Sequence, residues 1–163
     1  WIMLLEEERA VMCGREILRC RSALEPHFVA LHRLHLADEV GHVHWDEALL
    51  DYLWQPSSAG LRQANAVLLR WLMGEFFVVP KRSNVRVVVQ LVREFPALQP
   101  LLPQCRLALR ALKDCDAWNT SLFSRVSTPR AFARFDIWPE MHSMRRVLRG
   151  YIPRACEESR EHG

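Results

Sequence analysis

Residues 32–46 read HRLHLADEVGHVHWD, and the interpretation of the whole chain starts from this stretch. On a helical wheel with about 100° per residue and His35 at zero, Glu39 falls near roughly 40° and His42 near roughly −20°. Three side chains that bind metals well therefore project from one narrow stripe. Glu39 and His42 also have the Glu-x-x-His spacing by which one helix offers a carboxylate and an imidazole to a pair of metal ions.

Histidines on helices are more often surface or hydrogen-bonded core residues than metal ligands. We assign this ordinary role to His27, His32, His44, His142 and His162. His35, Glu39 and His42 differ because three ionisable groups on one stripe would be costly to turn into a helical core without a ligand. The stripe therefore predicts a metal site.

Outward from this stretch, the chain is predicted to be all-α, a helical bundle in a single domain spanning residues 1–163. Apolar residues recur with helical spacing over residues 2–23, and Glu25-Pro26 ends that segment. We expect a long helix over residues 27–54, and then a helix that Ser57 or Ser58 caps. Further helices are expected over residues 84–94, 107–113 and 141–149, the last of them ending at Gly150. Residues 76–80 are expected to form a buried connection. Residues 116–139 are expected to be irregular, apart from a helix start at Ser127-Thr128-Pro129.

The first helix supplies a candidate carboxylate for the metal site. If the turn centres near residue 25, antiparallel helices place opposite each other residues whose numbers add to roughly 47–50. Glu8 then lies opposite the stretch from Glu39 to His42. Glu6 and Glu7 are expected to be a solvated acidic turn, which the dipole of the helix N-terminus favours.

Composition excludes several other classes of function. The net charge is +3 and the arginines are spread along the chain, so no nucleic-acid partner is expected. No apolar run reaches the roughly 18–20 residues of a membrane span, so no membrane partner is expected either. Five cysteines without a Cys-x-x-Cys pair indicate a reducing, cytoplasmic location with thiols packed as small apolar groups.

The pattern of Glu8, His35, Glu39 and His42 resembles the carboxy-terminal half of the p-aminobenzoate N-oxygenase family. Residues 127–136 and Pro139-Glu140 are similar to that family's C-terminal region. The resemblance implies a ferritin-like bundle in which these four residues bind two iron ions, with manganese possible. It also implies O2 and a small organic substrate, possible N-oxygenation of an arylamine, and an unspecified electron donor.

The chain departs from that family because a second Glu and a second Glu-x-x-His motif are missing. The chain also starts at Trp1 in what reads as mid-helix, so we expect that an upstream helix pair is absent from this sequence. A homodimer that completes the site from two copies is the alternative. Rival functions are a ferroxidase, iron-storage or manganese bundle, and a non-enzymatic helical interaction domain.

Overall fold

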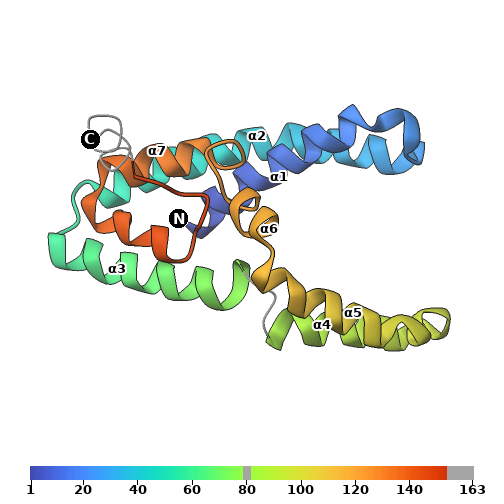
Figure 1. The fold of residues 1–163 in the computed structure, drawn as a ribbon. Helices are drawn as coiled ribbons and strands as arrows, with labels where there is room; N and C mark the ends of the chain where they lie inside the picture. The colour runs from blue at the N-terminus through green and yellow to red at the C-terminus, as the bar shows by residue number, and fades with distance from the viewer. Residues whose placement is uncertain (79–81, 154–163) are drawn as a thin grey trace, which may run out of the picture.

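The computed structural model describes residues 1–78 and 82–153, and the elements named within these ranges are all helical (Figure 1). The all-α prediction is therefore confirmed. The α-helices are α1 (Ile2–Arg19), α2 (Pro26–Trp54), α3 (Ala59–Leu72), α4 (Arg82–Glu94), α5 (Leu102–Ala111), α6 (Asp116–Ser121) and α7 (Pro129–Ile137). Short 3₁₀ segments are η1 (Arg21–Ala23), η3 (Pro96–Leu101), η4 (Leu112–Asp114) and η5 (Pro139–Arg146), and η2 (Met73–Phe77) is a π-helix.

Helices α1 and α2 form an antiparallel hairpin that carries the predicted site (Figure 1). The Glu25 side chain caps α2 by accepting a hydrogen bond of 2.7 Å from the Phe28 N–H, and Pro26 occupies the first turn, where a missing N–H costs nothing. Gly14 lets the helices approach closely, because a Cβ atom there would lie 3.3 Å from Leu36 Cδ1. The predicted break at Glu25-Pro26 and the long helix after it are confirmed.

Helix α7 lies beside α2 at the open end of the hairpin (Figure 1). Arg134 on α7 forms a two-pronged ion pair with Asp51 on α2, in which Nε donates to Oδ1 at 2.9 Å. Beneath this pair, the Trp1 ring lies 5.1 Å from the rings of both Trp54 and Phe135. The chain's main apolar core therefore lies at this end, and it leaves the far end of the hairpin uncovered.

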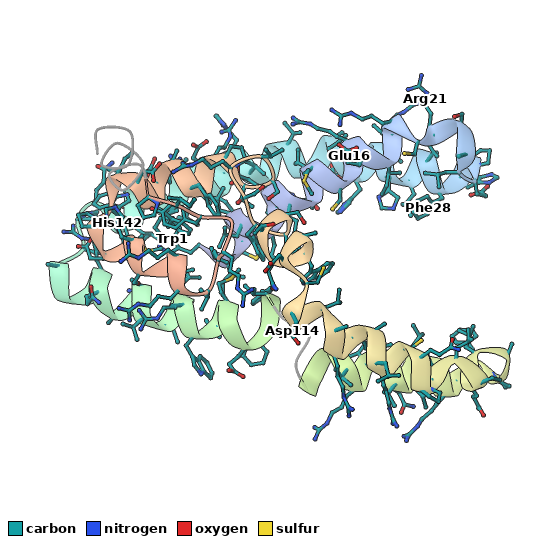
Figure 2. The ribbon with its side chains drawn as sticks, in the orientation of Figure 1. Trp1, Glu16, Arg21, Phe28, Asp114 and His142 are labelled. Atoms are coloured by element: carbon teal, nitrogen blue, oxygen red, sulfur yellow. The ribbon has the colours of Figure 1, made fainter. Side chains whose placement is uncertain are left out.

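The rest of the hairpin projects away from the core. Figure 2 shows it running from Glu16 through Arg21 to Phe28, beyond the other helices. A second hairpin, α4–α5, projects separately (Figure 1), and Val92 is its buried hydrophobic residue among those described. The fold therefore has a packed end and two projecting arms.

The carboxy-terminal third departs from the sequence prediction. Residues 116–139 were expected to be irregular but contain α6 and α7, so that prediction was wrong except for the helix start at Ser127-Thr128-Pro129, which matches the start of α7 at Pro129. The expected helix over residues 141–149 is instead the 3₁₀ segment η5. The helices predicted over residues 84–94 and 107–113 correspond to α4 and to part of α5. The predicted buried connection over residues 76–80 is described only as far as Val78, because Val79 and Pro80 lie outside the described residues.

The cysteine prediction was wrong for two of the four described thiols. Cys13 and Cys20 on and next to α1 are exposed, while Cys105 and Cys115 are partly buried. The two exposed thiols lie seven residues apart in the sequence.

Gly150 was expected to end a helix, and the structure gives it a different role. A Cβ atom at this position would lie 2.3 Å from the backbone oxygens of both Phe123 and Thr120. Backbone cannot yield as a flexible side chain can, so Gly150→Ala should lower the free energy of unfolding by about 2–4 kcal/mol. Gly60→Ala is the control, because nothing lies within 4 Å of its added Cβ. Chemical denaturation of both variants checks this, and equal stabilities would contradict it.

Candidate metal centre

Glu39 lies between the two histidines that share its stripe on α2. Its Oε1 atom is 3.0 Å from His35 Nε2, and its Oε2 atom is 3.1 Å from His42 Nδ1. The Glu39 side chain is only 9% exposed, whereas those of His35 and His42 are 52% and 58% exposed. The sequence-predicted trio is thus brought together, with a buried carboxylate that offers one oxygen to each of two imidazoles.

Helix α1 contributes Glu7 to this group. Glu7 Oε2 lies 3.7 Å from His42 Nδ1, and the Glu7 side chain is 12% exposed. One donor atom each from Glu7, Glu39 and His42 lies within 4.8 Å of the others. We call Glu7, Glu39, His42 and the neighbouring His35 the hairpin cluster.

The spacing of the donor atoms is suitable for a metal ion. Two ligands at about 2.1 Å from one ion and at right angles to each other lie about 3.0 Å apart. The distances from His42 Nδ1 to Glu39 Oε2 and to Glu7 Oε2, 3.1 and 3.7 Å, are of this size. The residues present therefore fit a divalent ion that binds carboxylate and imidazole.

Glu8, predicted as the α1 ligand, is placed elsewhere by the structure. Its Oε1 accepts a hydrogen bond of 2.8 Å from the Arg130 N–H, and its Oε2 accepts one of 2.9 Å from the Ala131 N–H. These N–H groups lie in the first turn of α7, where they have no hydrogen-bond acceptor within the helix. Glu8 of α1 therefore caps α7 although the two are distant in sequence. Burial raises the pKa of the Glu8 carboxyl above its usual range, and the two N–H groups and the Arg130 charge oppose this rise.

The predicted orientation of α1 was therefore wrong by one residue. The axial alignment with α2 was right, because Glu7 is adjacent to Glu8 and reaches the same level of α2. Consecutive helical residues point about 100° apart, so α1 turns Glu7 toward the histidines and Glu8 toward α7. The expectation that Glu6 and Glu7 form a solvated acidic turn was also wrong, because Glu7 is nearly buried and Glu6 is partly buried and pairs with Arg9.

Asp46 is a further acidic group on the same side of α2, one turn beyond His42. Its Oδ2 atom is buried and has no hydrogen-bond partner within the described part of the chain. The charge of Asp46 instead acts on the α-amino group of Trp1, whose pKa it raises against the larger lowering effect of burial. Asp46 is therefore not counted among the ligands.

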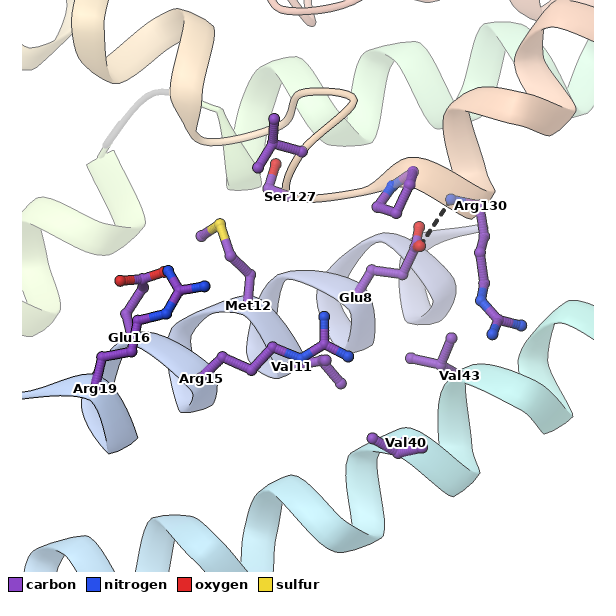
Figure 3. Close-up of a pocket in the computed structure, with 12 residues that line it drawn as sticks. Glu8, Val11, Met12, Arg15, Glu16, Arg19, Val40, Val43, Ser127 and Arg130 are labelled. Carbon is purple, nitrogen blue, oxygen red and sulfur yellow. Dashed lines mark hydrogen bonds and ion pairs between the residues drawn. The ribbon is translucent and has the colours of Figure 1, made fainter. Parts of the chain in front are cut away.

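A separate groove of about 230 Å³ lies between α1, α2 and the start of α7 (Figure 3). Its apolar walls include Val11, Val40 and Val43, and Figure 3 shows Arg15 lying between α1 and α2. Glu8 lines this groove and Glu7 does not. Since these two residues point about 100° apart on α1, the groove and the hairpin cluster lie on different sides of the α1–α2 contact.

The contrasting roles of Glu7 and Glu8 can be separated by mutation. Glu7→Ala should weaken binding of Fe(II) or Mn(II) at least tenfold and change the stability of the metal-free chain by less than about 1 kcal/mol. Glu8→Ala should leave two amides of α7 without an acceptor and lower the free energy of unfolding by about 1–3 kcal/mol, with little effect on metal affinity. Metal titration and chemical denaturation of the two variants check this. If the effects were exchanged, Glu8 would be the ligand.

Comparisons with known proteins neither add to this assignment nor contradict it. No protein-family model, no curated protein and no solved structure matches this chain. None of the helices in residues 1–78 and 82–153 combines the length and apolar character that a membrane span requires. The site geometry therefore carries the functional conclusion by itself.

Proposed function

We propose that the hairpin cluster binds metal as part of a ferritin-like, carboxylate-bridged di-iron centre, which activates O2 to oxidise a small organic substrate. The observation that carries this proposal is the position of Glu39, whose two oxygens each face a different imidazole. A carboxylate placed in this way can bind one ion through each oxygen. Bridging carboxylates and Glu-x-x-His motifs are what di-iron helical bundles use.

The donor set is compatible with iron and manganese, which the resemblance implies. Carboxylate and imidazole ligands suit both, and the cluster has no thiolate among its donors. When bound, a reduced iron pair supplies electrons to O2, and the cofactor rather than the protein carries this chemistry. The chain's own residues hold the ligand-bearing helix in place: Val43 and Leu36 of α2 belong to the apolar packing of the hairpin, and Leu36 lies next to Gly14 of α1.

The substrate class rests on resemblance alone. The resemblance of the Glu8, His35, Glu39 and His42 pattern to the p-aminobenzoate N-oxygenase family implies an arylamine that would be oxidised at nitrogen, with the electron donor left open. The groove in Figure 3 is not assigned as the substrate site, because it lies on the Glu8 side of α1.

A non-enzymatic interaction domain is the second candidate, and one observation favours it. Helix α2 exposes large apolar side chains along much of its length, including Leu34 at 69% and Trp45 at 77%. Faces of this kind are typical of protein–protein contacts. In that case the histidines would be incidental to a docking surface.

Anaerobic titration with Fe(II), followed by exposure to O2 and an arylamine, tests the proposed function. We expect about one ion per chain, because Glu7 and Glu39 provide the two negative charges that balance one divalent ion. Glu39→Ala should lower metal affinity most, because it removes the carboxylate that lies between His35 and His42. His44→Ala is the control, because His44 is exposed and points away from the stripe.

The outcomes separate the rival functions. Oxygen consumption coupled to amine oxidation supports the oxygenase. Iron oxidation without substrate oxidation favours a ferroxidase, and preferential binding of Mn(II) favours a manganese bundle. A chain that binds neither metal contradicts the proposal and leaves the interaction domain.

A further inference from the structure

One chain supplies half of the ligand set that a di-iron helical bundle needs. Such a bundle uses a Glu from each of two helices and a Glu-x-x-His motif from each of the other two. Here α1 supplies one Glu, Glu7, and α2 supplies one motif, Glu39 to His42. Two copies of the hairpin contain the full set, with four carboxylates and two motif histidines.

We propose that a second copy of this chain packs on the open face of α2 and completes the metal centre, so that both copies hold each of two ions. This inference rests on the proposed function, because it assumes that the hairpin cluster binds metal. The partner copy then contributes ligands, and the site is incomplete without it.

The two oxygens of Glu39 indicate how the ligands would be shared. Oε2 lies beside His42 and Glu7, and these three residues can hold one ion. Oε1 lies beside His35, on the other side of the carboxylate. At this second position, the described residues of one chain offer no ligand besides Glu39 and His35. Under twofold symmetry, this second position of one copy is the first position of the other. Each ion then receives Glu7, Glu39 and His42 from one copy and an oxygen of the partner's Glu39.

The charge of the ligands agrees with this arrangement. Glu7 and Glu39 of one chain carry two negative charges, which balance one divalent ion. Two copies carry four charges and balance two ions. Unbalanced charge in a site that excludes water would be costly, so a lone chain is not suited to hold an ion pair.

The apolar residues of α2 are arranged for self-pairing. On the helical wheel, Phe28, Leu31, Leu49 and Leu53 lie within about 40° of His35. These four side chains are 44%, 63%, 54% and 56% exposed, two of them on each side of the cluster along the helix. Apolar residues that bracket a polar centre are what an antiparallel helix pair with a buried site requires.

The register of this pairing follows from the motif itself. An antiparallel pairing that brings Glu39 opposite the partner's His42 aligns residues whose numbers add to about 81. The same register places Leu31 near the partner's Leu49, and Phe28 near the partner's Leu53. One twofold axis thus satisfies both the ligands and the apolar side chains, as an isologous interface demands.

The exposed area of the chain leaves room for such an interface. The whole chain exposes 10865 Å², whereas a folded monomer of 19.1 kDa is expected to expose about 8,400 Å². The excess is larger than the roughly 800 Å² that each partner buries in a standard interface. The uncovered face of α2 is part of this excess.

Analytical ultracentrifugation with metal analysis tests the proposal on the whole chain. We expect a dimer that holds about two Fe(II) or Mn(II) ions. Leu49→Glu places a charge in the interface, so it should give a monomer whose metal affinity is at least tenfold lower, with unchanged helix content by circular dichroism. Leu107→Glu on α5 is the matched control, because Leu107 is 66% exposed and lies outside this face; it should remain a dimer with both ions.

A mixing experiment tests the pairing residue by residue. Leu31→Lys and Leu49→Glu chains should each be monomeric alone. Mixed together, they should form a heterodimer, because the introduced lysine of one chain faces the introduced glutamate of the other on one side of the axis, and the native leucines meet on the other side. Recovery of metal binding in the mixture supports the shared site.

The failure of this inference is distinguishable from the failure of the proposed function. A monomer that binds metal as tightly as the dimer would overturn the shared site and leave the metal centre standing. A Leu49→Glu chain that stays dimeric, or a mixture that does not assemble, would also overturn it. A chain that binds no metal, dimeric or not, would overturn both.

Discussion

The close antiparallel contact of α1 with α2 is the constraint on which the rest of the molecule depends. Gly14 against Leu36 sets how near the two helices come, and the capped turn at Glu25-Pro26 sets their alignment. At this distance a carboxylate on α1 reaches an imidazole on α2 directly. The same contact presents a second carboxylate of α1 to α7, so both the cluster and the packed end of the fold are built on it.

The helical architecture and the level of the site along the hairpin could be predicted from the sequence, while the rotation of α1 could not. Pro26 and the length of the turn fix which residues of two antiparallel helices lie at one height, and Glu7 and Glu8 both satisfy that condition. The choice between them depends on which side of α1 packs against α2 and α7. Apolar residues such as Leu4, Leu5 and Val11 are buried on more than one side of this helix, so its periodicity gave no single inward direction.

Helix α7 was predicted only at its start, for a related reason. Its nine residues are too few to show a clear helical periodicity of apolar side chains. Its stability comes from contacts with residues distant in sequence. Arg134 needs Asp51, and the amides of Arg130 and Ala131 need Glu8, which lies more than a hundred residues away. The Pro129 start was readable as a helix signal, but what holds the helix in place was visible only in three dimensions.

The arrangement of Glu7 and Glu8 links two parts of the molecule mechanically. Both side chains are attached to one rigid turn of α1, one directed to His42 and the other to the first turn of α7. A twist of α1 about its own axis that draws Glu7 inward must also pull on the amides that Glu8 holds. One turn of α1 therefore joins the hairpin cluster to the start of α7, the helix that carries Phe135.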